Sequence, residues 1–216
     1  MMRVTRCFAL ALMFCAGLGS KGAWAQDANA DLYDAVAPAN SAFVRVMNLS
    51  ERGIEATLTS KTTTQRIGAG QFSGYRFVEP GLHRIAVEGQ VLETELEANT
   101  ASTVLYRDGQ LQLLKDDVVK EPARAQIVFY NLTDTNAALT TSDGATPVVS
   151  SRSPYQNGSR MVNEVKIGFA VYQDQHKLAE YPEQLLRKGR SYSYAVMPEG
   201  DGYRAMMIAN SIDPSQ

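Results

Sequence analysis

Beyond residue 25 this chain of 216 residues contains no cysteine and no tryptophan. Both cysteines, Cys7 and Cys15, and the single tryptophan, Trp24, lie in the first 25 residues. If that segment is removed, the remaining chain can form neither disulfide bonds nor thiol-based metal or redox sites. The loss of Trp24 also removes the side chain that offers the largest flat surface for stacking on a sugar ring.

Histidine is equally scarce, since His83 and His176 are the only two in the chain. Neither belongs to a cluster of histidines and carboxylates, whereas a metal site needs several such ligands at short spacing. We expect both histidines to lie on the protein surface. The sequence therefore predicts no metal ion and no cofactor.

Motifs for covalent catalysis are absent from the sequence. There is no Gly-x-Ser-x-Gly elbow for a nucleophilic serine, and the glycines at 68 and 70 are not followed by the lysine of a phosphate-binding loop. The acidic pair Asp116 and Asp117 is interpreted as solvated charge in a linker. The sequence predicts that this chain alone is not an enzyme, with an acetyltransferase that has an unrecognised site as an alternative.

The first 25 residues have the three parts of a secretory signal peptide. Arg3 and Arg6 give a basic start, residues 7–18 are apolar, and a small-x-small motif ends at Ala25. The apolar run is too short for a membrane span, which needs roughly 20 residues. We expect cleavage between Ala25 and Gln26, export to the periplasm and no transmembrane segment in the mature chain.

Cleavage would also change the charge of the protein. The formal net charge of −2 becomes −5, because the signal carries three basic residues and no acid. Nucleic-acid-binding proteins usually display a basic surface. A nucleic-acid partner is therefore not expected, and a polyanionic polymer would be mildly repelled.

From residue 41 onward the pattern is that of β-strands. Residues 41–49 alternate large apolar residues with others, and Asp108–Gly109 lies between the apolar runs Thr103–Tyr106 and Leu111–Leu114. An Asp-Gly pair between two such runs is a strong hairpin signal, because both turn positions need positive φ. Short strands at regular spacing predict an all-β protein made of small β-sandwiches, Ig-like or jelly-roll-like.

The second half of the chain repeats the first. Val44–Ser50 aligns with Ile127–Thr133, 83 residues further on. Two copies at this period indicate duplicated domains, since a solenoid would need more and shorter units. The predicted organisation is a signal peptide at 1–25, an extended segment at 26–40, a first sandwich at 41–115, a linker at 116–124 and a second sandwich at 125–212.

Two pairs of residues have both a functional and a structural interpretation. Asn48 and Asn131 fit the N-glycosylation pattern, but a role in the turn after the first strand of each repeat is favoured. Tyr192 and Tyr194 lie on one face of a strand and could form a sugar platform. We expect them in the hydrophobic core instead.

One segment of the second repeat is predicted to be a long polar loop. Residues 142–160 are rich in Ser, Pro, Gly and Asn, and loops of this length often carry function. Arg152, Tyr155, Asn157 and Arg160 are the candidate residues for binding a partner, and a floppy surface insertion is the alternative.

The residues also resemble a known family. Leu32–Tyr33, Ser41–Arg45, Val162–Asn163 and Phe169–Tyr172 are similar to segments of the alginate biosynthesis protein AlgF family. The resemblance covers essentially the whole chain after residue 25 and rests on short strand motifs. The family has no catalytic motif, so no catalytic residue is carried over.

The resemblance implies a periplasmic protein required for O-acetylation of an exopolysaccharide, most directly alginate, in biofilm-forming bacteria. It implies partners, namely a membrane acetyl-transfer protein and periplasmic acetyltransferases. The main hypothesis is therefore a non-catalytic adaptor in this complex. The alternative is a carbohydrate-binding module that holds alginate or acetylated cellulose near the acetyltransferases.

Overall fold

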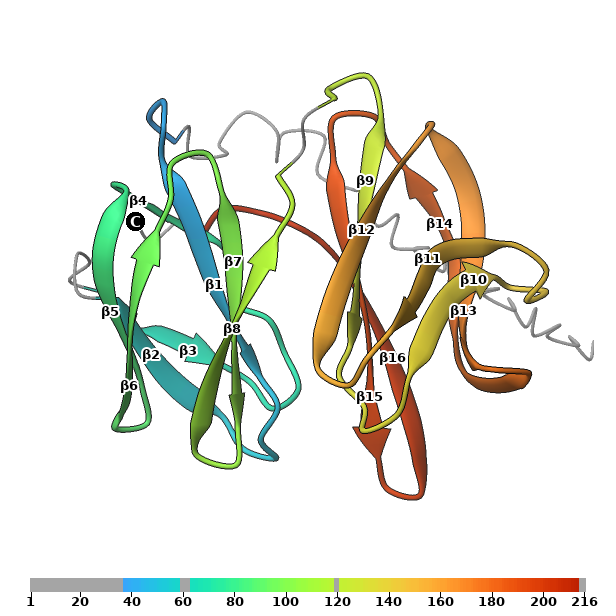
Figure 1. Cartoon of the computed structure of the whole chain (residues 1–216), viewed down its shortest axis with the longest axis horizontal. Coiled ribbons are helices and arrows are strands. Elements are labelled where there is room, and N and C mark those ends of the chain that lie inside the picture. Colours follow the sequence, from blue (N-terminus) through green and yellow to red (C-terminus); the bar gives the residue numbers. More distant parts are fainter. Residues whose placement is uncertain (1–36, 59–62, 119–120, 214–216) are drawn as a thin grey trace, which may run out of the picture. The chain divides into compact units, whose positions relative to one another are not determined.

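The computed structural model describes residues 37–58, 63–118 and 121–213, all of which fall in one compact unit, Asp34–Gln216. In these ranges the chain forms strands β1 to β16, joined by turns and loops, and no helix (Figure 1). This confirms the predicted all-β class. The predicted signal peptide, its cleavage site at Ala25–Gln26 and the lead-in up to residue 36 lie outside the described residues.

The first repeat is a sandwich of two four-stranded sheets. One sheet has the order β4-β1-β7-β8 and the other has the order β3-β2-β5-β6. β1 and β7 run parallel, and β1 pairs with β4 in the antiparallel sense. The strands are β1 Ala42–Asn48, β2 Ile54–Leu58, β3 Gln65–Ile67, β4 Arg76–Val78, β5 Gly81–Val87, β6 Gln90–Leu96, β7 Ala101–Arg107 and β8 Gln110–Asp116.

The second repeat has the same topology, strand for strand. Its sheets have the orders β12-β9-β15-β16 and β11-β10-β13-β14, and β9 runs parallel to β15. The strands are β9 Ala125–Asn131, β10 Ala137–Thr141, β11 Pro147–Arg152, β12 Gln156–Val162, β13 Val165–Gln173, β14 His176–Leu186, β15 Ser191–Glu199 and β16 Gly202–Ala209. Two equal topologies in one chain support the predicted duplication.

An asparagine at the end of the first strand makes the same contacts in both repeats. The Nδ2 atom of Asn48 donates to the carbonyl oxygens of Arg52, Ile67 and Gly68 at 2.7–3.2 Å. Asn131, its counterpart, donates to three carbonyl oxygens at 2.7–3.1 Å. Both asparagines are fully buried. Their role in the turn is confirmed, because a buried amide that satisfies several carbonyl groups fixes the local chain path.

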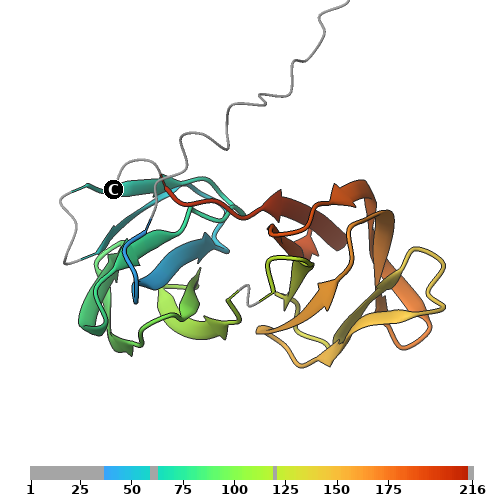
Figure 2. The ribbon, with the colours of Figure 1, turned by 90° about the horizontal axis from the view of Figure 1, so that it is seen from above.

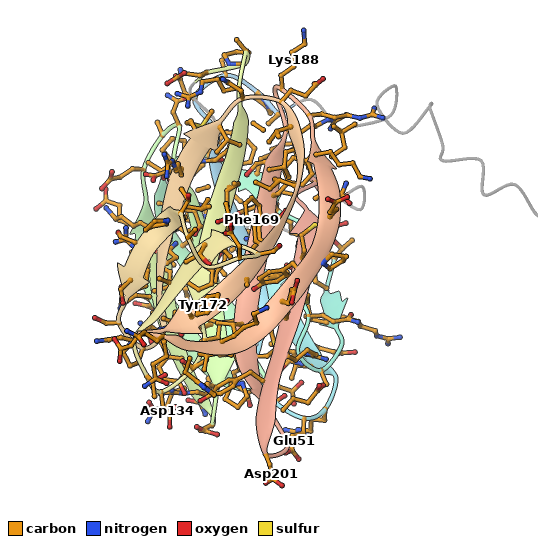
Figure 3. The ribbon with its side chains drawn as sticks, turned by 90° about the vertical axis from the view of Figure 1, so that its right-hand side faces the viewer. Glu51, Asp134, Phe169, Tyr172, Lys188 and Asp201 are labelled. Carbon is orange, nitrogen blue, oxygen red and sulfur yellow. The ribbon has the colours of Figure 1, made fainter. Side chains whose placement is uncertain are left out.

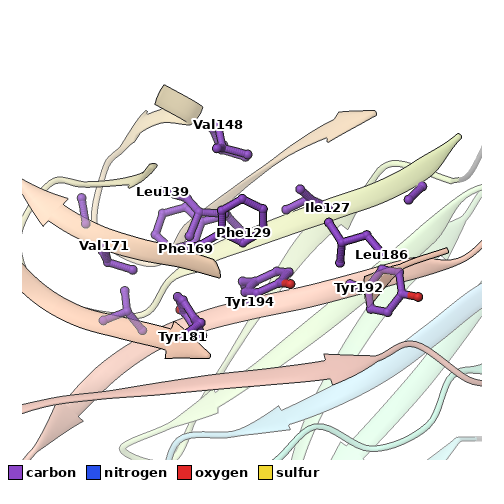
Figure 4. Packing of buried hydrophobic residues seen from close by; sticks show 14 residues of the cluster. Ile127, Phe129, Leu139, Val148, Phe169, Val171, Tyr181, Leu186, Tyr192 and Tyr194 are labelled. Atoms are coloured by element: carbon purple, nitrogen blue, oxygen red, sulfur yellow. The ribbon is translucent and has the colours of Figure 1, made fainter. Parts of the chain in front are cut away.

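Buried and exposed residues alternate along the strands, and the buried side chains form the cores of the sandwiches. In β2, Ile54, Ala56 and Leu58 are buried, while the residues between them are exposed. The second sandwich has a larger, aromatic core (Figure 4). The ring of Tyr194 meets Phe169 edge to face at 5.1 Å between centroids, and Tyr192 is buried near it. The prediction that these two tyrosines are core residues is confirmed.

The predicted hairpin at Asp108–Gly109 is also confirmed. Its two residues have φ values of 51° and 72°, and β7 and β8 pair in register on either side. A second turn of this kind, Glu88–Gly89, joins β5 to β6 with φ values of 48° and 82°. Both turns have the positive φ angles of the hairpin turns that match strand twist.

The prediction of a long loop at 142–160 is wrong for most of that segment. β11 occupies 147–152, and β12 pairs with β9 along its whole length, from Gln156 opposite Asn131 to Val162 opposite Ala125. β12 is an edge strand of its sheet, where polar side chains are tolerated. Its polar composition therefore suggested a loop, although its backbone pairs with β9 along its whole length.

The prediction of a surface position is wrong for His83 and confirmed for His176. His83 is buried, and its Nε2 atom lies 2.8 Å from the carbonyl oxygen of Glu79. Residues two apart in a strand share a face, so His83 points inward with Ile85, and Leu82 points outward. His176 is exposed at the start of β14.

Candidate functional site

The two sandwiches meet through the sheets that contain their first strands. Apolar side chains from both sheets form a third hydrophobic cluster, separate from the two sandwich cores. Its buried members are Met47, Leu105, Leu114, Val128, Tyr130, Leu132, Ala195 and Met197. We call this contact the junction. It makes the described residues one packed unit instead of two separate sandwiches on a tether.

Arg45 of β1 lies at the centre of the junction with only 1% of its surface exposed. Its Nε atom donates to Thr103 Oγ1 at 3.0 Å, and its Nη atoms donate to three groups of the second repeat at 2.8 Å. These acceptors are Asn210 Oδ1, Tyr130 OH and Ser193 Oγ. The guanidinium also lies over the rings of Phe72 and Tyr75, at 4.1 and 4.3 Å from their centroids.

Asp116, the last residue of β8, carries the compensating charge. The prediction that it is a solvated linker residue is wrong, because it is 6% exposed. Its carboxylate accepts hydrogen bonds from Tyr75 OH at 2.9 Å, Thr103 Oγ1 at 2.6 Å, Tyr130 OH at 2.7 Å and Asn157 Nδ2 at 2.6 Å. Thr103 and Tyr130 contact both Arg45 and Asp116, so they link the two buried charges.

The environment fixes the protonation states in this network. Burial raises the pKa of Tyr130 to about 12, although the Arg45 charge opposes this shift. Burial lowers the pKa of Arg45, but the charges of Tyr130, Tyr75 and Asp116 raise it overall. At neutral pH the guanidinium is therefore charged and the Tyr130 hydroxyl is protonated. The hydroxyl can then accept from Arg45 while it donates to Asp116.

The segment after β16 adds a second connection between the sandwiches. It crosses from the second sandwich to the first (Figure 2), where Tyr75 N donates to Ser211 O at 3.0 Å and Asp213 N donates to Tyr75 O at 2.7 Å. The Asp213 carboxylate lies 3.3 Å from the Nε atom of the buried Arg76. The first sandwich is thus completed by residues from the end of the second repeat.

A hollow of about 430 Å³ opens at one end of the junction, and both repeats line it. We call it the Tyr155 hollow. The guanidinium of Arg107 lies 3.6 Å from the centroid of the Tyr155 ring, across the two repeats. Its lining includes Leu49, Glu51, Gly70, Arg107, Asp108, Leu132, Tyr155, Met197, Glu199 and Arg204.

Tyr155 is held in an unusual conformation at the edge of this hollow. Its φ angle is 55°, which is uncommon for a bulky residue other than glycine. Its carbonyl oxygen accepts from Gln112 Nε2 at 3.2 Å, so backbone and ring both contact the first repeat. Residues kept in such conformations often occur at functional sites.

Arg204 of β16 forms another wall of the hollow. Its Nη2 atom donates to the Gly70 carbonyl oxygen at 3.1 Å, and its Nε atom lies 3.6 Å from Glu199 Oε1. Acidic residues lie around the opening. Glu51 and Asp201 lie at the same end of the unit, opposite the end that carries Lys188 (Figure 3). The hollow thus has an apolar floor, two arginines and an acidic rim.

The four residues predicted to bind a partner are divided by the structure. Tyr155 lines the hollow, and Asn157 lies at the junction, where its Nδ2 atom also donates to Lys115 O at 2.9 Å. Arg160 donates to the carbonyl oxygens of Pro147 and Val148, and Arg152 packs over Gly158. These two arginines stabilise the β11–β12 region and do not join Tyr155.

Two general features bear on function. Among residues 37–58, 63–118 and 121–213, no group of three or more His, Cys, Asp or Glu side chains is arranged to hold a metal ion. Nor does the described part of the chain contain any helix with the length and apolar character required to span a membrane.

Arg45 and Asp116 were missed by the sequence reasoning, since single charged residues carry no motif.

Comparisons with known proteins show the family to which the chain is similar. The family described as "Alginate O-acetyl transferase AlgF" matches residues 15–193. The alginate biosynthesis protein AlgF of Azotobacter vinelandii is 32% identical over 174 residues, covering 80% of each chain. The protein of the same name from Pseudomonas fluorescens is 28% identical over 208 residues, covering 96% of this chain and 95% of the relative.

Two solved domain structures of AlgF from Pseudomonas aeruginosa are each similar to part of this chain. The C-terminal domain of AlgF is 25% identical, with a TM-score of 0.38, over 41% of this chain and 99% of that chain. The N-terminal domain is 24% identical, with a TM-score of 0.34, over 38% of this chain and 99% of that chain. Since the family match covers most of the sequence, the chain belongs to the AlgF family.

Proposed function

We propose that this protein acts in the O-acetylation of alginate as a non-catalytic periplasmic adaptor. The process is supported by the family, described as an alginate O-acetyl transferase, and by the relatives, which are named alginate biosynthesis proteins. The buried polar network supports the non-catalytic role, because Arg45 and Asp116 are enclosed and satisfied within the protein. A membrane acetyl-transfer protein and periplasmic acetyltransferases are the proposed partners.

The observation that carries the adaptor role is the composition of the Tyr155 hollow. Tyrosine, arginine and methionine are enriched at protein–protein interfaces, and hot spots concentrate in such residues. Tyr155, Arg107, Arg204 and Met197 meet here over the apolar floor of Leu49 and its neighbours. Since both repeats contribute, a partner bound here would recognise the assembled pair of sandwiches.

Capture of the acetylation proteins from a producing strain tests this proposal. Tagged wild-type protein should retain the membrane acetyl-transfer protein or a periplasmic acetyltransferase through a salt wash. Arg107→Ala combined with Tyr155→Asn should lose them, since asparagine tolerates the positive φ while the ring is removed. Arg66→Ala is the matched control, because Arg66 is an exposed arginine on β3 in the other sheet.

The expected cellular result is polymer that is still made but lacks acetyl groups in the double variant. Normal acetylation and normal capture in that variant would refute a role for the hollow. Loss of the polymer itself would argue against a specific role in acetylation.

A second candidate is carbohydrate binding, favoured by a different hollow. It measures about 430 Å³ and combines the rings of Phe43 and Tyr75 with the polar side chains of Gln126, Ser191 and Asn210. Aromatic faces with convergent polar groups suit a sugar ring. Calorimetric titration with oligomannuronate tests this candidate, and the absence of heat at millimolar ligand would eliminate it.

The family description includes the word transferase, so catalysis by this chain is a third candidate. Hydrolysis of a chromogenic acetyl ester by the purified protein provides the test. Activity that a single Ser→Ala change abolishes would replace the adaptor proposal.

A further inference from the structure

β6 is a free edge of the first sandwich, since β5 is its one strand neighbour among the described residues (Figure 1). β5 and β6 pair in a continuous register from Val87 opposite Gln90 to Gly81 opposite Leu96, without a bulge. A free, regular edge of this kind can accept a further strand.

Several other edges of the two sandwiches are obstructed. β14 contains Pro182, and its pairing with β13 has two register shifts. β8 and β12 lie against each other at the junction, where Asn157 of β12 donates to the Lys115 carbonyl oxygen of β8. The edge at β4 is preceded by Tyr75, which pairs with Ser211 and Asp213. β6 has none of these protections.

The turn geometry shows which backbone groups β6 offers. In a two-residue hairpin the pair next to the turn is hydrogen-bonded, and hydrogen-bonded pairs then alternate with non-bonded ones. The pair Val87–Gln90 adjoins the Glu88–Gly89 turn, so Leu92, Thr94 and Leu96 bond to β5. The N–H and C=O groups of the residues between them, Val91, Glu93 and Glu95, therefore point away from β5.

The side chains of β6 have two different faces. Val91, Glu93 and Glu95 are exposed on the outer face, with Val91 48% exposed and Leu82 of β5, which lies opposite Glu95, 75% exposed. On the inner face Leu92 is partly buried against the sandwich core, as are Leu111 and Leu113 of β8. An added strand would thus meet partly covered leucines on one face and carboxylates on the other.

The charge of the edge selects the partner. Residues 88–97 contain four glutamates and no lysine or arginine, and Glu88, Glu93 and Glu97 form exposed ion pairs with Arg52, Arg84 and Lys115 at 3.1–3.3 Å. A second copy of this strand would place glutamates opposite or beside glutamates, which is destabilising. A strand with lysine or arginine on its outer face would instead form cross-strand pairs.

We propose that β6 binds an extended segment of a protein partner in which basic and apolar residues alternate, as an added strand. The apolar residues cover Leu92 and its neighbours on β8, and the basic residues lie beside Glu93 and Glu95. This inference rests on the proposed adaptor function. It places a second partner contact on the first sandwich, distinct from the Tyr155 hollow.

A synthetic peptide tests the inference on the full exported chain, residues 26–216. The probe is a nine-residue capped peptide of alternating lysine and valine, and the control has the same composition with lysines and valines in separate blocks. The expected result is amide exchange at Val91, Glu93 and Glu95 slowed about tenfold by the alternating peptide only, because hydrogen bonding protects amides. No protection at these amides, or equal protection by the block peptide, refutes the inference.

Three variants sharpen the test. Glu93→Pro removes an N–H that points away from β5, a position where an edge strand tolerates proline, and should abolish binding. Glu93→Gln keeps the N–H and should still bind. The double change Glu93→Lys and Glu95→Lys should lower the affinity for the lysine–valine peptide about tenfold and should favour binding of a glutamate–valine peptide instead. Equal binding by all variants would contradict a strand-addition mode.

Two further outcomes separate the alternatives. A dimer of the free protein that Glu93→Pro dissociates would show that β6 pairs with a second copy, and would overturn the basic-partner assignment. The peptide result is independent of the capture experiment, because Arg107→Ala with Tyr155→Asn leaves β6 unchanged. A protein that fails to bind the peptide but captures the acetylation proteins refutes the inference and leaves the adaptor proposal intact.

Discussion

Replacement of Arg45 by methionine tests whether the buried network holds the two sandwiches together. Methionine has a similar apolar length but no charge, so the change removes four hydrogen bonds and leaves the Asp116 carboxylate without its compensating cation. Breaking a buried ion pair by removing one partner costs about 3–5 kcal/mol. Asp116 keeps its hydroxyl and amide donors, which places the expected loss near the lower limit.

Urea unfolding at pH 7, followed by circular dichroism, measures this loss. In thermal unfolding, a unit of this size should show a decrease in Tm of roughly 6–20 °C for a loss of that magnitude. The control is Arg66→Ala, in which an exposed ion pair with Glu55 is lost. That change should cost less than about 0.5 kcal/mol.

The double variant Arg45→Met with Asp116→Asn gives the sharper result. Once both charges are gone, no uncompensated charge is buried. The unfolding free energy lost in the double variant should therefore be clearly smaller than the sum of the losses in the two single variants. Coupling is expected although Thr103 and Tyr130 separate the two charges. Additive losses, or single losses below about 1 kcal/mol, would refute the reasoning that these charges form one unit.

Three other changes have definite expected outcomes. Asn131→Ala removes the buried amide that donates to three partly buried carbonyl groups and should lower the unfolding free energy by about 2–4 kcal/mol in urea titration, whereas Asn157→Ala, at a more exposed position, should cost less. The pKa of Tyr130 is about 12 in the folded protein and about 10 in the unfolded chain. The protonated Tyr130 hydroxyl therefore contributes fully to the unfolding free energy below pH 10, and this contribution is lost as the pH rises to 12. Tyr130→Phe should therefore make the fall in stability between those pH values shallower by about 1.4 kcal/mol per pH unit, and an unchanged slope would contradict the assignment. Tyr155→Gly, which suits a φ of 55°, should not destabilise the protein by more than about 1 kcal/mol even though it removes the Arg107 contact, so a large loss would show that the ring is mainly structural.

Local sequence signals predicted the fold well because they depend on neighbouring residues. The Asp108–Gly109 turn, the turn role of Asn48 and Asn131, and the burial of Tyr192 and Tyr194 follow from turn chemistry and strand periodicity. The 83-residue repeat reappears as two equal topologies. The domain limits drawn from the sequence stay a proposal, and the first residue of the proposed 116–124 linker belongs to β8.

The junction could not be predicted in the same way. Arg45 and Asp116 are 71 positions apart in the sequence, and no motif connects them. Arg45 of the first repeat occupies the position equivalent to Val128 of the second repeat. The alignment of the two repeats therefore gave no sign that Arg45 has a role of its own. Polar residues in β12 suggested a loop because edge and junction strands do not need an apolar face. Contacts between elements distant in sequence decided these positions.

The return of residues 211–213 to the first sandwich has a consequence for how the chain is made. A chain is synthesised from its N-terminal end, so the first sandwich leaves the ribosome before Asp213 has been added. Until then Arg76 lacks that carboxylate, and Tyr75 lacks its backbone partners. A chain that stops before residue 211 would therefore keep a first sandwich without this ion pair and without these backbone hydrogen bonds.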